Sequence, residues 1–369
     1  MAFTNRSFGD THKIRIRLSI KAAEIVRSDM EVFQIKTYSD FINTVIQNYR
    51  DEASASKTLY LQKKRQEILK ALYKCSLDPK VLEQICNALI EKEENALKTK
   101  LKEYMRHNRT DDIRLQYISK NNTDFLEGKN TTGNSCLEDE SELFKTPGDY
   151  LRCIIEEFCE LPFSARERIV RKEIFTEIED AIRAHDCLRV LSFYKREPTY
   201  YHVKPYKILN DTLGGQSYLV CLSFPEKEPG LPLEPARIAS FTIFRMNKPE
   251  RIRSDSTCDP FFTKEEITEI QNRLSTTPPA YLTFDEEEIH VRLTEEGKRK
   301  YNNLLYSRPI LDKEKSSEYE YVFFCSTRQA YNYFFSFGKD AEICSPDNLR
   351  NWIARDYKHA LDIYNYTGE

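Results

Sequence analysis

Basic and aromatic side chains crowd the segment from Cys187 to Leu209, where the residue types could do chemistry on a polyanion. The segment holds five basic and five aromatic residues against one acid, Glu197. They are Arg189, Lys195, Arg196, Lys204 and Lys207, with Phe193, Tyr194, Tyr200, Tyr201 and Tyr206. Aromatic rings stack on unpaired bases, which contributes about 1 to 3 kcal/mol each, while Lys and Arg contact phosphates. The pattern therefore predicts a surface for single-stranded nucleic acid.

Two more strands must position this segment. The stretches SYLVCLSF, from Ser217, and RIASFTIFRM, from Arg237, are rich in β-branched and aromatic residues, and Gly214-Gly215 suits a hairpin turn. A helix at 163–184 leads directly into the basic segment. Together these elements predict a small, strongly bent antiparallel sheet or partial barrel.

Residues for catalysis or metal binding are not arranged in any recognisable pattern. The run from Asp285 to Glu288 is typical of a solvated turn, and the six histidines and ten cysteines show no ligand or triad spacing. With 10 Gly, there is neither a GxxxxGK nor a GxGxxG motif. We therefore expect no catalytic residue, no metal and no cofactor, and we expect the cysteines to be buried, reduced thiols.

Length and composition predict a multidomain protein without a membrane span. The 369 residues exceed one hydrophobic core, and 40% hydrophobic with 31% charged residues fit a globular chain. The net charge of −3 decides nothing, because local patches bind polyanions. No apolar run approaches the roughly 18 residues that cross a bilayer, and the N-terminus lacks a signal-peptide pattern. We expect a cytoplasmic location.

A strand and two helices are predicted near the N-terminus. KIRIRLS, from Lys13, alternates apolar and basic residues, while apolar residues recur at helical spacing up to Phe33 and again from TYSDF to Tyr49. A lone strand leaves both edges unpaired, so dimerisation through this strand is expected. The order resembles the ribbon-helix-helix family across roughly residues 12–52.

This resemblance implies a two-stranded ribbon that enters the major groove. Lys13, Arg15 and Arg17 would face nucleic acid, and the second helix would point its N-terminus at a phosphate. The family often has Gly in the turn between its helices, where Gln34 to Lys36 stand here. The alternative is a basic strand face that is merely solvated.

The rest of the chain continues with helices and then mixed elements. Two long helices are predicted from Thr58 to His107, as a spacer or dimer arm, followed by a polar loop or linker at 120–142. Helices resume at 147–160. After a helix at 264–274, the C-terminal part reads β-α-β-β-α-β, which predicts a ferredoxin-like unit. Its aromatic-rich helix, around Tyr331 to Phe337, serves mainly the core and could form a second dimer contact.

The basic segment and its neighbours resemble the WYL domain, an Sm-like barrel. The resemblance rests on the RVLSFY strand, the Val203 to Pro205 step, Tyr218 with Leu219, and the FTIFRM strand that ends in Arg245. Ser217 replaces the signature Trp, and His202 and Thr242 replace two arginines. The family's groove binds nucleic acid or a small effector. The resemblance implies these binding residues: Arg189, Tyr194, Lys195, Arg196, Tyr201, His202, Lys204, Lys207, Ser217, Tyr218 and Arg245.

The expected fold is α+β and multidomain. Its expected parts are a ribbon-helix-helix at 1–53, a helical spacer and polar linker at 54–146, helices at 147–184 that lead into the barrel, a WYL domain at 185–255, and a ferredoxin-like extension that dimerises at 256–369. The ending, around Gly338, Pro346 and Arg350, is similar to the C-terminal extension of WYL regulators.

This combination resembles the WYL accessory proteins of RNA-targeting, type VI-D CRISPR systems. The resemblance implies a non-catalytic homodimer that binds single-stranded RNA and enhances an RNA-guided ribonuclease. One alternative is a transcriptional regulator that binds DNA through the ribbon and senses a ligand through the barrel. A third, weaker reading is an antitoxin-like scaffold that uses the helical arm for a protein partner.

Overall fold

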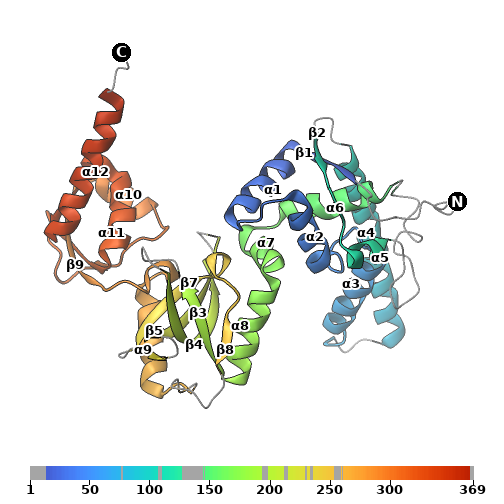
Figure 1. The fold of residues 1–369 in the computed structure, drawn as a ribbon, viewed down its shortest axis with the longest axis horizontal. Helices are drawn as coiled ribbons and strands as arrows, with labels where there is room; N and C mark the ends of the chain where they lie inside the picture. Colours follow the sequence, from blue (N-terminus) through green and yellow to red (C-terminus); the bar gives the residue numbers. More distant parts are fainter. Residues whose placement is uncertain are drawn as a thin grey trace. The chain divides into compact units, whose positions relative to one another are not determined.

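The structure is a computed structural model, and it divides into two compact units, Met1–Lys172 and Glu173–Glu369 (Figure 1). It describes residues 14–75, 78–106, 110–126, 144, 146–192, 198–211, 215–228, 231–232, 236–252, 259 and 261–365. Helices and antiparallel sheets are mixed in both, which confirms an α+β, multi-unit chain.

The N-terminal unit is mostly helical. Its elements are β1 (Arg15–Ser19), α1 (Ile20–Val32), α2 (Tyr38–Tyr49), α3 (Lys57–Leu72), α4 (Pro79–Met105), β2 (Thr110–Arg114), α5 (Lys120–Leu126), α6 (Pro147–Glu160) and α7 (Phe163–Val170). The predicted strand and helices up to α4 are confirmed, as is α6. Strand β2 was not predicted from the sequence. Helix α5 occupies the first residues of the expected linker at 120–142, and residues 127–142 lie outside the described residues.

Strand β1 finds its partner within the same chain. It pairs antiparallel with β2, with Ile16 opposite Ile113. Its other side lies against α6, where a side chain on Gly148 would approach the Arg15 carbonyl oxygen to 2.9 Å, and Ser19 Oγ donates to Glu156 at 2.7 Å. The expectation that a second copy supplies the partner strand is therefore wrong. The partner, β2, belongs to the same chain and begins at Thr110, far beyond the segment in which the strand was predicted.

Helix α6 is the centre of this unit. A capping box between Thr146 and Asp149 begins the helix, and Phe158 packs edge-on against Phe41 and Tyr49 of α2. Its carboxylates are not exposed: Glu157 accepts hydrogen bonds from the backbone and hydroxyl of Ser54. A buried carboxylate is tolerated only when it is hydrogen-bonded in this way.

The first part of the C-terminal unit is a bent sheet between two helices. Its elements are α8 (Lys172–Ala184), β3 (Cys187–Ser192), β4 (Thr199–Asn210), β5 (Ser217–Glu228), β6 (Leu231–Pro232), β7 (Arg237–Thr242), β8 (Glu250–Ile252) and α9 (Lys264–Thr276). The strand order is β6-β5-β4-β3-β8, with β7 also paired to β5. A register shift between Pro205 and Lys207 bends the β4–β5 pair.

Both faces of this sheet are covered. On one face, Phe175 and Ile178 of α8 join Leu188, Val203 and Leu219 in one core. On the other face, Val220 and Leu222 pack with Ile270 of α9, Leu282 and the partly buried Tyr206. Helix α9, which the sequence analysis assigned to the C-terminal extension, thus covers the face that was expected to be open.

The last part has the expected ferredoxin-like topology. Its elements are β9 (Glu287–Leu293), α10 (Glu295–Asn303), β10 (Leu311–Asp312), β11 (Tyr321–Cys325), α11 (Thr327–Phe334), β12 (Ala341–Ser345) and α12 (Asp347–Asn365). The strands are antiparallel in the order β10-β11-β9-β12, which confirms β-α-β-β-α-β. Tyr333, Phe334 and Phe337 are buried, while Tyr331 stacks on Trp352 at 4.0 Å. Core packing therefore accounts for these aromatic residues.

Three chemical features bear on function. Among the described residues, no helix is long and apolar enough to cross a membrane, and no cluster of His, Cys, Asp and Glu could hold a metal ion. Seven described cysteines are free, but Cys187 is disulfide-bonded. The expectation of reduced thiols throughout is wrong at Cys187, because cysteine spacing in a sequence does not reveal which cysteines form disulfides.

Candidate nucleic-acid interface

The expected binding residues of β3 and β4 do share one face of the sheet. Arg189 lies opposite His202 across the β3–β4 pair, and Lys204 follows two residues later on the same face. This face is the one that α9 and the residues before it cover. The alternation of side chains was thus predicted correctly, whereas the exposure of the face was not.

Lys204 is fixed inside the protein. Its side chain is 4% exposed, and Nζ donates to the Phe261 carbonyl at 2.8 Å and to Glu266 at 3.0 and 3.2 Å. The ammonium also lies 4.7 Å from the ring centre of Phe262. Glu266 is held in turn by the capping box at the start of α9. Lys204 therefore joins α9 to the sheet and is not presented to a ligand.

Arg189 and His202 share one carboxylate. Arg189 donates to both oxygens of Glu226, at 2.7 and 3.0 Å, and His202 Nε2 lies 2.7 Å from the same group. These hydrogen bonds, first that from Arg189, hold the pKa of Glu226 below its ordinary value, while Glu226 raises the pKa of Arg189. His202 is buried, and its Nδ1 has no hydrogen-bond partner in the described part of the chain.

One part of this cluster reaches solvent. The guanidinium of Arg189 lies 3.7 Å from the ring centre of Tyr200, whose side chain is 38% exposed. Bidentate pairing to Glu226 prevents the guanidinium from leaving the sheet to follow a phosphate. Tyr200, which the sequence analysis counted among the aromatics but not among the binding residues, is the group of this cluster best placed to stack on a base.

The remaining expected residues of the bent sheet do not converge on one groove. Ser217 and Tyr218 are buried, and Tyr201 packs edge-on against Phe241 of the core. Lys207 is half-buried beside Tyr206, and Arg245 is exposed after the end of β7. Tyr194, Lys195 and Arg196 lie outside the described residues. Of the expected set, Lys207 and Arg245 are the described cations without a carboxylate partner.

The ribbon presents a second basic surface, which we call the ribbon face: Arg15, Arg17 and Arg114. These side chains are exposed, and Arg15 lies opposite Arg114 across the strands. Asp112 sits among them, in contact with Arg15 and 3.6 Å from Arg17, and these contacts lower its pKa, that with Arg15 most. Lys13 lies outside the described residues.

Arg114 and Asp112 were missed by the sequence analysis because β2 was missed. The only local signal was Ile113 and Leu115 alternating with Asp112 and Arg114, a short pattern in a segment rich in residues that disfavour strands. Among the described residues, the ribbon face therefore carries Arg114 and Asp112 in addition to the expected Arg15 and Arg17.

The start of α2 does not offer a free phosphate site. Thr37 caps the helix by accepting from the Asp40 amide at 3.1 Å, and Thr37 donates to the Asp40 carboxylate at 2.7 Å. Tyr117 also donates to this carboxylate, and these bonds, that from Tyr117 first, lower the pKa of Asp40. A carboxylate therefore already occupies the positive end of the helix that the family resemblance assigned to a phosphate.

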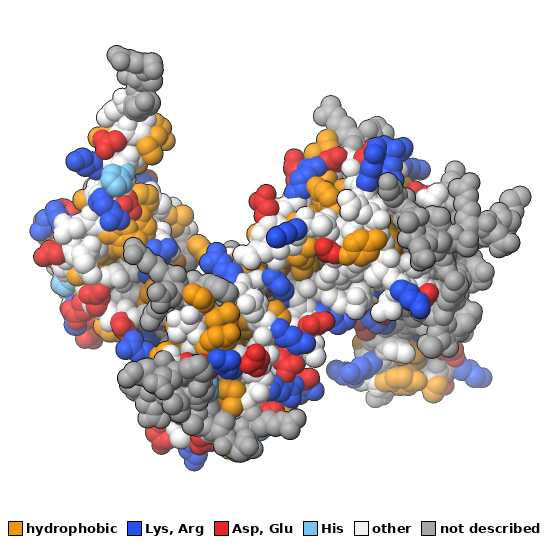
Figure 2. All heavy atoms as spheres, viewed as in Figure 1, with side chains coloured by type: hydrophobic (Ala, Val, Ile, Leu, Met, Phe, Trp, Pro, Cys, Tyr) orange, Lys and Arg blue, Asp and Glu red, His pale blue; other side chains and the backbone are white. Residues whose placement is uncertain are grey.

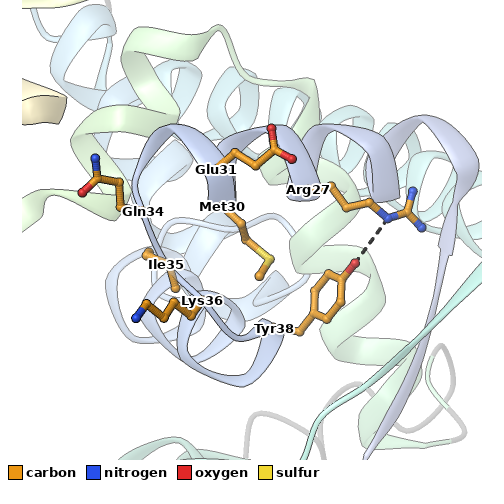
Figure 3. A pocket seen from close by; sticks show the side chains of 7 residues that line it. All are labelled: Arg27, Met30, Glu31, Gln34, Ile35, Lys36 and Tyr38. Carbon is orange, nitrogen blue, oxygen red and sulfur yellow. Dashed lines mark hydrogen bonds between the residues drawn. The ribbon is translucent and has the colours of Figure 1, made fainter.

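The turn before α2 takes the conformation that Gly would favour. Gln34 has a φ of 57°, so a residue with a side chain adopts the left-handed region here. The turn borders a hollow of about 510 Å³, in which Met30 and Tyr38 face each other while Arg27 donates to the Tyr38 hydroxyl at 3.2 Å (Figure 3). Arg27 also contacts Asp111, whereas Lys36, which lines the same hollow and is exposed, has no ion pair among the described residues.

No broad single-sign patch stands out on the face shown in Figure 2, where Lys and Arg side chains are interspersed with Asp and Glu. Nucleic-acid binding on such a surface must depend on small groups of unpaired cations and exposed rings. Lys207, Arg245 and Tyr200 are groups of this kind, and so is Arg114 of the ribbon face, which has no ion pair among the described residues, whereas Arg15 and Arg17 are partly neutralised by Asp112.

Comparison with known proteins shows a shared fold. No family model matches the chain, and no curated protein does. The chain is similar to a solved structure described as "Crystal structure of a CRISPR Cas-related protein", with a TM-score of 0.71 and 22% identity over 98% of this chain and 96% of that one. A second structure, proteasome accessory factor B/C (PafBC) of Arthrobacter aurescens, has a TM-score of 0.23 and 15% identity over 52% of this chain and 28% of that one, too little to support an argument.

Proposed function

We propose that this chain is a non-catalytic accessory protein of an RNA-targeting CRISPR system, which binds single-stranded RNA and enhances an RNA-guided ribonuclease. In this proposal the N-terminal unit is a ribbon-helix-helix module and the bent sheet is a WYL domain. The observation that carries the proposal is the fold shared with a CRISPR Cas-related protein along nearly the whole of both chains.

Cations that reach solvent, together with one exposed ring, support the choice of nucleic acid. Arg15, Arg17 and Arg114 form the exposed ribbon face, half-buried Lys207 lies on β4, and exposed Arg245 follows the end of β7. Tyr200 supplies a ring that can stack on a base, which a duplex backbone would not use. The proposal keeps these groups as contacts and leaves Lys204, His202 and Ser217 to a structural role, because they are buried.

The symmetry of the ribbon favours RNA over an operator. A ribbon built from two copies of one strand is two-fold symmetric and reads a palindromic duplex. Here β1 reads RIRLS and β2 reads TDDIR, so the two strands present different side chains. The second candidate function is that of a ligand-responsive DNA-binding regulator. It is supported by the two-stranded ribbon itself, because the major groove of DNA is wide enough to admit a ribbon of two strands.

A homodimer in the cytoplasm completes the proposal. Since β1 is paired within the chain, we assign dimerisation to the ferredoxin-like part, where Ile310 and Phe324 are 49% and 55% exposed. Sedimentation of the wild-type chain beside an Ile310→Ser/Phe324→Ser variant tests this assignment.

The function is tested by adding the protein to an RNA-guided ribonuclease of the same CRISPR class. We expect faster RNA cleavage with wild-type protein, and a smaller effect with an Arg17→Ala/Arg114→Ala variant that folds normally. Cleavage that does not respond to the wild-type protein would contradict the accessory role. Cleavage that responds equally to both would move the contact away from the ribbon face.

A further inference from the structure

The first helix of the long hairpin has a strongly one-sided charge. Helix α3 carries five basic residues and one acid, Glu67, whereas α4 balances five lysines with five glutamates. Glu67 is already bound to Lys64 at 2.7 Å. The expected spacer covered with both Lys and Glu therefore describes α4 but not α3.

Three lysines lie on one side of α3, which we call the lysine stripe: Lys63, Lys70 and Lys74. They are seven and four residues apart, so they share one side of the helix at about 10 and 6 Å along its axis. The helical path continues to the last of them, since Tyr73 has φ −61° and ψ −17° and the Lys74 amide donates to Ala71 at 3.3 Å. All three are exposed.

The opposite side of α3 explains the orientation of the stripe. Leu61, Ile68 and Leu72 recur at helical spacing and are partly buried, as expected for the side that packs on α4. The other cations of the helix have acidic or polar partners: Lys57 binds Glu94 at 2.7 Å, and Arg65 donates to Asn87 at 2.7 Å. Within the described residues, the lysines of the stripe have no ion pair.

An exposed ring lies beside the lysine stripe. Tyr73 is 72% exposed and makes no ring contact among the described residues. Figure 2 shows basic and hydrophobic side chains next to each other at the free end of the α3–α4 hairpin. Unpaired cations with an adjacent exposed ring are the combination that binds a single strand, through phosphates and one stacked base.

We propose that the lysine stripe and Tyr73 form a separate binding surface for the backbone and one base of single-stranded RNA. The inference rests on the proposed function, which supplies RNA as the polyanion, and extends it to an arm that was regarded as a spacer. The stripe gives the N-terminal unit a second contact besides the ribbon face. Two linked contacts bind one RNA more tightly than either contact alone.

The test replaces the stripe without disturbing the helix. The variant Lys63→Gln/Lys70→Gln/Lys74→Gln keeps good helix formers at exposed positions, so its unfolding should match wild type. The matched control, Lys80→Gln/Lys92→Gln/Lys102→Gln, removes the same charge from exposed positions of α4 that lie beside acids. Affinity for a fluorescent single-stranded RNA is measured from about 50 to 200 mM salt.

We expect the stripe variant to bind about tenfold more weakly at low salt, and its salt slope to fall by about 2, at about 0.7 per lost contact. The control should stay within about threefold of wild type, since it changes only the long-range field. Equal losses in both variants, or none in the stripe variant, would overturn the inference while leaving RNA binding intact. A wild-type protein that binds no RNA would instead overturn the proposed function as well.

Tyr73→Ala separates stacking from charge. We expect this variant to lose about fivefold or more in affinity for RNA and nothing for heparin, a polyanion without bases. An equal loss on both ligands, or no loss on RNA, would remove the stacked base from the proposal.

Discussion

Replacing Lys204 by Met tests whether this lysine is structural or binds nucleic acid. Met fills a similar volume without charge, so the change removes the hydrogen bonds to Phe261 and Glu266 and leaves the packing against Phe262. The part-buried hydrogen bond from the ammonium to the Phe261 carbonyl would be lost, and a hydrogen bond from a charged group contributes about 1.5 to 3 kcal/mol. Two effects reduce this loss of stability. The Glu266 side chain is 29% exposed, so water can replace its lost partner, and the variant no longer needs to remove the Lys204 ammonium from water on folding.

These contributions give a net loss of about 2 kcal/mol in the free energy of unfolding. For a unit of this size such a loss lowers the melting temperature by about 4 to 8 °C. Thermal and urea unfolding measure the loss, and Lys207→Met, on the same strand but without an ion pair in the described residues, serves as the control at below about 0.5 kcal/mol. RNA affinity of the folded Lys204→Met protein should equal wild type. Unchanged stability with weaker, less salt-sensitive RNA binding would refute the structural role.

Three further changes follow from the charges and backbone. Hydrogen bonds, first that from Arg189, keep the pKa of Glu226 low, so the stability that Glu226 contributes is present above its ordinary pKa and is lost as the pH falls through the lowered value. Urea unfolding from pH 7 to 3 should therefore show a weaker dependence of stability on acid in Glu226→Gln than in wild type. An unchanged dependence would contradict this prediction. Gln34→Gly should stabilise the N-terminal unit by about 0.5 kcal/mol, since relief of the left-handed conformation exceeds the entropy cost of Gly, and a lower urea midpoint would oppose it. Asp112→Asn should raise RNA affinity about threefold and steepen the salt dependence of binding, because the Asp112 carboxylate competes with RNA phosphates for the arginines of the ribbon face. Weaker RNA binding by this variant in a titration would mean that Asp112 instead positions these arginines.

Local patterns predicted the elements of this fold well. Alternation identified the strand before Ser19, helical spacing identified the helices up to Met105, and the β-α-β-β-α-β order of the C-terminal part needed only the sequence of elements. Such patterns report which side chains share a face. They do not report what covers that face, which is why β4 was expected to be open although α9 packs on it.

The candidate site depended on long-range pairs that no local pattern contains. Lys204 meets Glu266 and Arg189 meets Glu226 across 62 and 37 residues, so their charges are neutralised by partners far along the chain. The missed strand β2 shows the same limit, because Asp112 disfavours a strand locally and is stabilised there by Arg15. The resemblance to ribbon-helix-helix proteins predicted the correct elements but the wrong source for the second strand.

The most direct test of the central claim is a comparison of affinity for single-stranded RNA and for duplex DNA of the same length, at several salt concentrations. The proposed function predicts tighter binding of single-stranded RNA at physiological salt, with a salt slope that reports several phosphate contacts. Substantially tighter binding of the duplex at the same salt would contradict it, and would favour the DNA-binding regulator.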